Sequence, residues 1–190
     1  MELKAEQLTE IFKEVIHNKQ AQQAIEIVRR NSQGKIWIIG GFVYKSLARK
    51  LYGKPEAQSK DYDFIVEQPN SEIVLPEGWK RKLNHFGNPK FVGDFQIDFV
   101  PLRMVYSILR RKIPATIDNY LNGTPLNIQS IAYDSEGRII GEVGISALER
   151  RVVAVNNLDM AKDIAWVFCK SVNDIIRKKA EELGFDAEYV

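Results

Sequence analysis

Residues 35–66 read KIWIIGGFVYKSLARKLYGKPEAQSKDYDFIV. They open with an apolar run from Ile36 to Ile39, which ends at the pair Gly40-Gly41. A short isoleucine-rich run that ends at glycine is typical of a buried strand. The next residues, 42–51, have the apolar spacing of a helix. Because glycine lets the backbone come close to a ligand, and a helix start has free N–H groups, this junction predicts an anion site.

Carboxylates stand in the apolar runs that follow. Asp61 and Asp63 are two residues apart, so in a strand they share one face while Tyr62 takes the other. Asp98 lies in the middle of residues 95–101, FQIDFVP, where a carboxylate is costly unless it is paired or binds a metal. Carboxylates that converge repel one another, and Mg²⁺ prefers oxygen ligands shared with substrate phosphates. We therefore expect a Mg²⁺ site, with room for two ions, beside the glycine pair.

The order of these motifs resembles that of the polymerase-β-type nucleotidyltransferase superfamily. The likeness is closest to the head domain of CCA-adding tRNA nucleotidyltransferases and bacterial poly(A) polymerases. Residues 38–43 (IIGGFV) resemble the hydrophobic-Gly-Gly-x-Val start of that domain, and residues 60–64 (KDYDF) its Lys-Asp-x-Asp strand. Residues 98–103 (DFVPLR) resemble its third-carboxylate strand, and residues 131–152 the segment that closes it. The likeness covers roughly residues 35–155.

The resemblance implies a metal-dependent enzyme that moves a nucleoside monophosphate from a nucleoside triphosphate to an acceptor hydroxyl and releases pyrophosphate. It also implies that nucleotide and RNA are partners, with an RNA or tRNA 3′ end as the acceptor. A small molecule or a protein hydroxyl are alternative acceptors. A regulatory, antitoxin-like module that holds a triphosphate without turnover, or an α+β domain whose acids are structural, are the non-enzymatic alternatives. The implied site is the following set: catalytic and metal-binding Asp61, Asp63 and Asp98, phosphate-cradling Gly40 and Gly41, and charge partners Lys45 and Lys60.

Two departures from the family pattern concern the nucleotide contacts. The family has Arg-Asp after the valine, where this chain has Tyr44-Lys45. We expect Lys45, in the first turn of the helix, to replace the arginine as a phosphate contact. The family's Arg-Arg-Asp element, which contacts the sugar of the incoming nucleotide, corresponds to residues 123–125, Gly-Thr-Pro. The sugar contact is therefore missing or rebuilt by Asn127 or Gln129.

The expected fold is α+β, with a small mixed, mostly antiparallel sheet flanked by helices. Residues 1–34 form an N-terminal helical segment packed on the core, with a helix over 2–31 that can break at His17-Asn18 and stops at Ser32-Gln33-Gly34. Residues 35–155 form the nucleotidyltransferase domain. Residues 156–190 form a neck-like remnant with one helix over 158–183. Further expected elements are a hairpin over 80–92, helices over 103–111 and 115–121, and strands over 127–133 and 138–142 joined by a turn at 134–137.

Composition limits the class of protein. The chain has 190 residues, 45% hydrophobic and 27% charged, which suits one compact core. The formal net charge of +2 excludes a strong global field for nucleic acid. One cysteine excludes an internal disulfide. The first residues lack a signal-peptide pattern, and no apolar run approaches the ~20 residues of a membrane helix, so we expect a soluble, cytoplasmic protein. Oligomeric state is not indicated.

Overall fold

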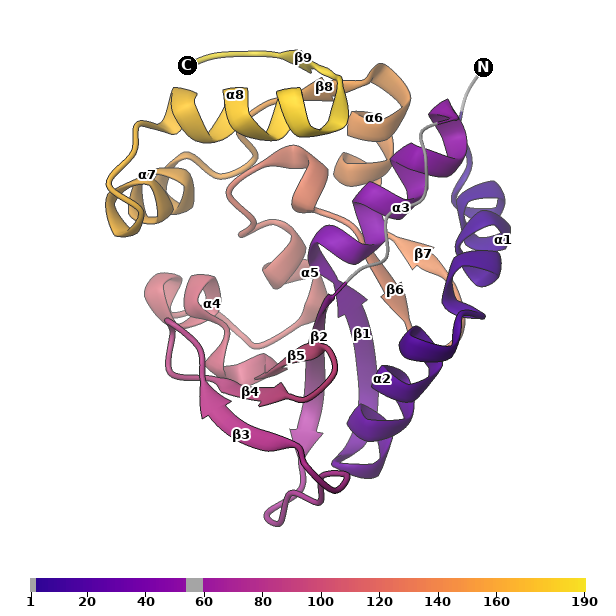
Figure 1. Ribbon diagram of the computed structural model, residues 1–190. Coiled ribbons are helices and arrows are strands. Elements are labelled where there is room, and N and C mark those ends of the chain that lie inside the picture. The colour runs from indigo at the N-terminus through magenta and orange to yellow at the C-terminus, as the bar shows by residue number, and fades with distance from the viewer. Residues whose placement is uncertain (1–2, 54–59) are drawn as a thin grey trace.

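The computed structural model describes residues 3–53 and 60–190. Its seven-stranded sheet has the order β3-β4-β5-β2-β1-β6-β7, with helices on both faces (Figure 1). Within this sheet β2 and β5 pair in parallel and the other neighbours pair antiparallel, which confirms the expected α+β fold. Residues 53–60, GKPEAQSK, have the composition of a polar loop, and all but the two ends of this segment lie outside the described residues. The strands are β1 (Ser32–Ile39), β2 (Asp61–Pro69), β3 (Lys80–Leu83), β4 (Pro89–Val92), β5 (Gln96–Pro101), β6 (Ala132–Asp134) and β7 (Ile139–Ile140).

Two helices precede the sheet, α1 (Ala5–Ile16) and α2 (Lys19–Arg30). The break predicted at His17-Asn18 is confirmed, because the Asn18 side chain accepts a hydrogen bond from the N–H of Ala21 and begins α2. The predicted helix end at residue 31 agrees with the end of α2 at Arg30, but Gly34 is not its C-cap, since β1 already starts at Ser32. Gly34 has a φ of 74° within β1, where the pairing with β2 shifts register, so this glycine serves a β-bulge.

One face of the sheet carries most of the core. Helices α1, α2 and α3 (Gly40–Tyr52) cover it (Figure 1). Aromatic rings join the layers: the centroid of Phe42 lies 5.5 Å from that of Phe12 and 4.7 Å from that of Tyr62. Leu8 and Ile176, from opposite ends of the chain, belong to the same apolar cluster. Residues from all three predicted parts thus share one core, and the division at 34 and 155 stays a prediction.

The other face holds a smaller apolar cluster. Trp37, Ile39 and Ile65 pack there against Val105 and Ile108. The covering elements are a 3-10 turn η1 (Leu102–Met104) and helices α4 (Tyr106–Arg111) and α5 (Ile117–Leu121). The two short helices predicted for this region are therefore present. Strand alternation sends the aspartates of β2 and β5 to this second face, beyond the end of its apolar cluster.

The segment after α5 differs from expectation. A strand over 127–133 is wrong, because residues 127–129 form a 3-10 turn, η2 (Asn127–Gln129), and β6 starts only at Ala132. The Asn127 carboxamide oxygen accepts from the N–H groups of Ile128 and Ala154, which replaces strand pairing with side-chain bonds. The turn at 134–137 is confirmed. The returning strand β7 is shorter than expected, since helix α6 (Glu142–Arg150) begins directly after Gly141.

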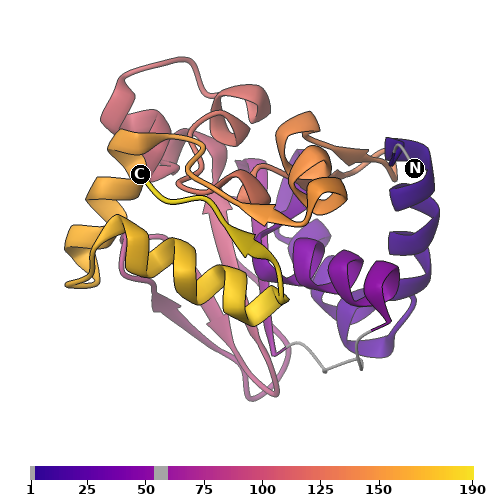
Figure 2. The ribbon, with the colours of Figure 1, turned by 90° about the horizontal axis from the view of Figure 1, so that it is seen from above.

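The single C-terminal helix predicted over 158–183 is wrong. The chain forms α7 (Leu158–Val167) and α8 (Val172–Leu183), which lie along the side of the molecule opposite α1 (Figure 2). Short strands β8 (Val152–Val153) and β9 (Asp186–Ala187) pair in parallel beside α8. Met160 is buried, as expected for a core residue, but Trp166 is 82% exposed. Within the described ranges, no helix combines the length and apolar character that crossing a membrane requires.

We expect Ser171→Ala to lower the free energy of unfolding by about 0.5–2 kcal/mol, the usual cost of losing an N-cap. The Ser171 hydroxyl accepts from the N–H of Asp174 at 3.0 Å, and the Asp174 carboxylate accepts from the N–H of Ser171 at 3.2 Å. Chemical denaturation measures the change. Ser135→Ala, in the exposed turn after β6, is the matched control and should change stability by less than ~0.5 kcal/mol. Equal stability of wild type and Ser171→Ala would contradict a separate start for α8.

Candidate active site

The parallel pairing of β2 with β5 brings the predicted carboxylates together. Asp63 lies directly opposite Asp98 in the register of the two strands, and their carboxyl groups interact. Asp61, two residues before Asp63, faces the same side of the sheet, and its negative charge also raises the pKa of Asp63. Tyr62 points to the opposite face and is 2% exposed. The alternation expected from the sequence therefore holds, and the acids form a close pair, Asp63 and Asp98, with Asp61 at its solvent side.

Asp63 has the most perturbed carboxyl of this group. Burial, and then the negative charges of Asp98 and Asp61, raise the pKa of Asp63 to about 7. The backbone of Gly40, whose φ is 72°, lies beside the Asp63 carboxylate. A Cβ added at Gly40 would collide with the Asp63 carboxylate, so only glycine leaves room for this acid at the start of α3. The glycine bend and the acidic pair thus belong to one site.

Asp98 is held by two side chains that the sequence did not suggest. The Asn84 carboxamide donates to one Asp98 oxygen at 3.1 Å, and the Lys90 ammonium lies 3.5 Å from the other. Lys90 stands directly opposite Asp98 in the register of β4 and β5. The hairpin over 80–92 was predicted, but only its register with β5 identifies Lys90 as a partner. Lys90 compensates part of the negative charge of the pair.

The donor set fits a divalent cation. Among the described residues, no three His, Cys, Asp or Glu side chains are gathered closely enough to hold an ion as a group. Asp63 and Asp98 instead provide two carboxylates whose mutual repulsion is only partly relieved, by Lys90 and by the proton that a raised pKa retains. Mg²⁺ is commonly held by one or two carboxylates plus substrate phosphates, which matches such a pair.

The glycine pair begins α3 itself. The helix starts at Gly40, and its N-cap residue, Ile39, has no side chain that caps the first turn. The N–H groups of the first turn therefore keep their capacity to donate, which suits an anion. The phosphate cradle that the sequence predicts at Gly40 and Gly41 is compatible with this geometry, and Gly40 also borders the pocket described below.

Lys45 is not in the first turn, as had been expected, because α3 starts at Gly40. Its side chain nevertheless folds back, and its ammonium lies 3.5 Å from the point that a Cβ on Gly41 would occupy. The ammonium forms an ion pair with Glu182 of α8, which also accepts from Lys179 at 2.6 Å. Burial alone would raise the pKa of Glu182, but the bonds from Lys179 and Lys45 lower it. In this conformation Lys45 is bound to protein.

Lys60 immediately precedes β2, and its side chain is exposed. Its carbonyl accepts from the N–H of Gln96 at 2.7 Å, which anchors the start of β2 on β5. Lys60 is adjacent to Asp61 in the sequence. Among the described residues its ammonium has no ion-pair partner. The backbone of Lys60 therefore helps to keep β2 in register with β5, which aligns Asp63 with Asp98.

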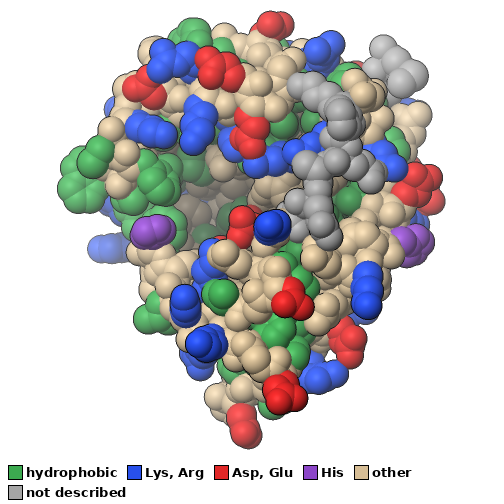
Figure 3. Space-filling model, viewed as in Figure 1, with side chains coloured by type: hydrophobic (Ala, Val, Ile, Leu, Met, Phe, Trp, Pro, Cys, Tyr) green, Lys and Arg blue, Asp and Glu red, His purple; other side chains and the backbone are tan. Residues whose placement is uncertain are grey.

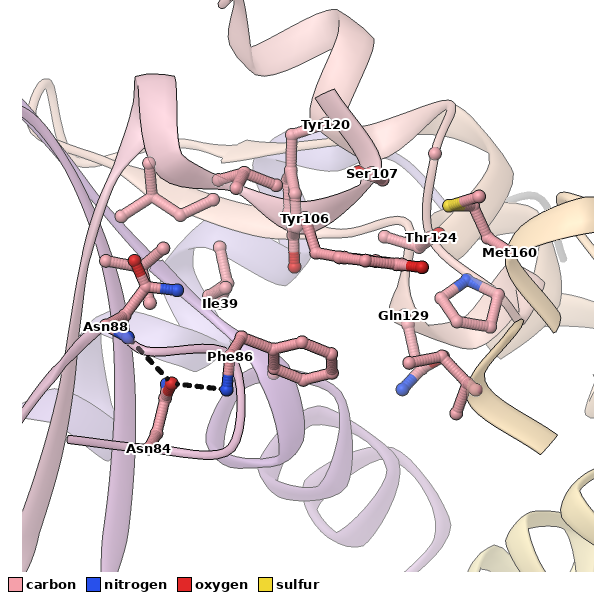
Figure 4. Close-up of a pocket in the computed structure, with 17 residues that line it drawn as sticks. Ile39, Asn84, Phe86, Asn88, Tyr106, Ser107, Tyr120, Thr124, Gln129 and Met160 are labelled. Atoms are coloured by element: carbon pink, nitrogen blue, oxygen red, sulfur yellow. Dashed lines mark hydrogen bonds between the residues drawn. The ribbon is translucent and has the colours of Figure 1, made fainter. Parts of the chain in front are cut away.

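A pocket of about 220 Å³ (Figure 4) is lined by Gly40 and Asn84, which adjoin Asp63 and Asp98 respectively. It extends from Gly40 and Ile39 to α4, α5 and α7, and its wall is mostly apolar. Phe86 and Tyr106 contribute aromatic rings with centroids 5.3 Å apart. The hydroxyl of Tyr120 is buried near Asp63, and burial together with that charge raises its pKa. Asn84 joins the two regions, since it lines the pocket and also donates to Asp98.

The pocket also includes residues 123–125, where the resemblance places a sugar-binding element. Thr124 is committed to the fold, because its hydroxyl bonds to the carbonyls of Leu121 and Leu126. Asn127 does not line the pocket, and its side chain holds the backbone of residues 152 and 154. Gln129 does line it. Its carboxamide oxygen accepts from the N–H of Leu126 at 3.2 Å, so of the two residues considered for the sugar contact only Gln129 lines the pocket, with its amide nitrogen as the group that remains.

Comparison with solved structures identifies the fold. A CCA-adding enzyme in complex with CTP matches 98% of this chain and 44% of its own, with a TM-score of 0.63 and 18% identity. A tRNA-processing enzyme in an apo form matches 92% and 44%, with a TM-score of 0.59 and 21% identity. The Thermotoga maritima CCA-adding enzyme complexed with tRNA matches 82% and 35%, with a TM-score of 0.54 and 20% identity.

These likenesses show the nucleotidyltransferase fold, related to the head domain of CCA-adding enzymes, as the sequence motifs predicted. The chain spans less than half the length of each of these proteins. No family model matches the sequence, and a search of curated protein sequences finds no match.

Titration of Asp63 should make stability depend on pH. Its folded-state pKa of about 7 lies above the ordinary value near 4, so between these pH values the folded protein keeps a proton that the unfolded chain has lost. Stability therefore falls as pH rises through this window and levels off above it. In EDTA, we expect the free energy of unfolding to fall by up to about 4 kcal/mol more in wild type than in Asp63→Asn between pH 4 and 7.5.

Asp94→Asn, at an exposed aspartate in the turn before β5, is the control and should keep the wild-type pH dependence. If the free energy of unfolding varied with pH in the same way for wild type and Asp63→Asn, the pKa of Asp63 would not be raised by its contact with Asp98.

Proposed function

We propose that the chain is a metal-dependent nucleotidyltransferase, which moves a nucleoside monophosphate from a nucleoside triphosphate to an acceptor hydroxyl. The observation that carries the proposal is the Asp63–Asp98 pair beside the glycine start of α3. A half-buried, partly compensated pair of carboxylates suits Mg²⁺, and the open helix start next to it suits phosphate. The structural neighbours include CCA-adding enzymes with CTP and with ATP, which supports a nucleotide substrate of this kind.

The proposed reaction is an in-line displacement at the α-phosphorus. The acceptor oxygen forms a bond to phosphorus as the bond to the β-phosphate oxygen breaks, pyrophosphate leaves, and the hydroxyl proton passes to a base. Asp98, held in place by Asn84 and Lys90, lies at the attacking oxygen as base or ligand. Gly40 and Gly41 hold the phosphates. Asp61, Asp63 and Asp98 would hold Mg²⁺, which would supply positive charge to stabilise the negative charge that develops during the displacement.

The pocket beside Asp98 is the proposed place for the nucleoside. Its apolar wall with two aromatic rings suits a flat base, and Gln129 offers a carboxamide for the sugar. Lys45 and Lys60 are the proposed partners of the triphosphate. Lys45 reaches it once a phosphate oxygen replaces Glu182 as the partner of its ammonium.

An RNA 3′ end is the proposed acceptor, since one structural neighbour is complexed with tRNA. The acceptor can be identified by incubating the protein with Mg²⁺, α-labelled triphosphates and total RNA. Label in RNA supports this proposal. Label in protein or in a small molecule changes the acceptor but keeps the reaction.

One observation favours a second candidate, a module that binds a triphosphate without transferring it. The ammonium of Lys45 is engaged by Glu182, and residues 123–125 offer no basic group to the nucleotide. This candidate would be favoured if the protein binds nucleotide stoichiometrically but releases no pyrophosphate over many hours, whichever acceptor is supplied.

We expect Asp63→Asn and Asp98→Asn each to lower Mg²⁺-dependent pyrophosphate release by at least ~100-fold, because loss of metal-ion stabilisation removes several kcal/mol from the transition state. Asp61→Asn should have a smaller effect, since Asp61 lies at the solvent side of the pair. Circular dichroism verifies folding of each variant. Asp94→Asn should retain full activity. Wild-type turnover in Asp63→Asn would overturn the assignment.

Mg²⁺ should bind more tightly as pH rises through 7. The proton that Asp63 holds below its pKa of about 7 competes with the ion, so binding releases it. In a thermal-unfolding assay, we expect 5 mM Mg²⁺ to raise Tm more at pH 8 than at pH 6, and to have no such pH-dependent effect on Asp63→Asn. An equal shift at both pH values would place the ion elsewhere on the molecule.

A further inference from the structure

A row of charged side chains crosses the sheet from its edge to the acidic pair. In register, Lys82 on β3 lies opposite Lys90 on β4, Lys90 opposite Asp98 on β5, and Asp98 opposite Asp63 on β2. Directly opposite residues point to the same face of a sheet, so all four side chains share the face of the active site. The 3.5 Å contact between Lys90 and Asp98 agrees with this arrangement.

The edge strand β3 carries two lysines on this face. Lys80 and Lys82 are two residues apart, so they point to the same side, and both are exposed. Among the described residues neither lysine has an ion-pair partner. Lys82 is two strands from Asp98, roughly 10 Å across the sheet. Two uncompensated cations thus lie at the sheet edge, on the same face as Asp98, the acid assigned to the attacking oxygen.

Exposed aromatic rings continue this surface. The turn after β3 presents His85 and Phe86, and the ring centroid of His85 lies 6.5 Å from that of Phe168, after α7. Phe86 and Phe168 are 41% and 51% exposed. Figure 3 shows hydrophobic side chains gathered beside a hollow on this face of the molecule. Rings next to cations are the combination that binds single-stranded nucleic acid, because bases stack on the rings and phosphates contact the cations.

We propose that this surface, formed by Lys80, Lys82, His85 and Phe168, binds the 3′-terminal segment of a single-stranded RNA acceptor and leads its terminal hydroxyl to Asp98. The inference rests on the proposed function in one respect, the place of Asp98 at the attacking oxygen. Lys80 and Lys82 contact the phosphodiesters just upstream of the terminal nucleotide, and the rings stack with its neighbouring bases. A small-molecule acceptor has no phosphodiester for these lysines.

The test measures binding of a fluorescent ten-nucleotide RNA by anisotropy, in EDTA and without nucleotide, across a range of salt concentrations. We expect Lys80→Gln/Lys82→Gln to weaken binding by roughly 5- to 25-fold at 0.1 M salt, and to reduce the slope of log K against log salt by about 0.7 per lysine. Phe168→Ala should weaken binding several-fold but leave that slope unchanged, because stacking releases no counterions.

The matched control is Lys4→Gln/Lys19→Gln, which removes the same charge from exposed lysines beside α1 and at the start of α2 and should bind like wild type. A second probe is an RNA with neutral methylphosphonate linkages at its last two positions. It should bind wild type as weakly as normal RNA binds the β3 lysine variant, and the variant should not distinguish the two RNAs.

Equal losses for the two lysine pairs would show a general charge effect and overturn the proposal. So would unchanged binding by Lys80→Gln/Lys82→Gln, in which case the lysines only protect the sheet edge from pairing. Absence of RNA binding by the wild type would also overturn it. None of these results bears on Mg²⁺-dependent pyrophosphate release with another acceptor, so the proposed function is tested separately.

Discussion

The site depends on the parallel pairing of β2 with β5, which holds two carboxylates face to face. This contact is unfavourable in itself, because burial and repulsion both oppose ionisation of Asp63. The strands are kept in register from the other face, where Tyr62, Phe64 and Phe99 pack beneath α3 and its neighbours. The two faces of one sheet therefore have different roles. The apolar burial on one face compensates for the electrostatic cost that the chemistry requires on the other.

The acids and their common face could be predicted from the sequence because the spacing rule is local. Strand alternation places Asp61 and Asp63 together without any knowledge of neighbouring strands. The contribution of Lys90 and Asn84 could not be predicted in the same way. Their contact with Asp98 depends on the register of β4 against β5 and on the turn that follows β3, which are set by packing between distant segments. The fold itself was recognisable because its motifs occur in the family order.

The wrong predictions share a physical cause. Periodicity indicates a regular element but does not show where side-chain bonds interrupt it. The Ser171 hydroxyl accepts from the N–H of Asp174 and so begins a new helix. The helix that was expected to be continuous is therefore divided, and Trp166 lies near the end of α7. Asn127 bonds to neighbouring backbone and replaces the expected strand with a turn. The ion pair of Lys45 with Glu182, more than 130 residues later in the chain, could not be anticipated from local spacing.

The positive groups around the acidic pair occupy three separate positions, and this arrangement constrains how substrates approach. Lys90 forms an ion pair with Asp98 and compensates part of the negative charge of the pair. The Lys45 side chain folds back to Gly41, beside the start of α3, where a triphosphate would meet the helix N–H groups. Lys80 and Lys82 lie at the sheet edge, two strands from Asp98. Two polyanions that meet at one carboxylate pair repel each other, so separate cationic approaches, one along α3 and one across β3, let both arrive without competing for the same charge.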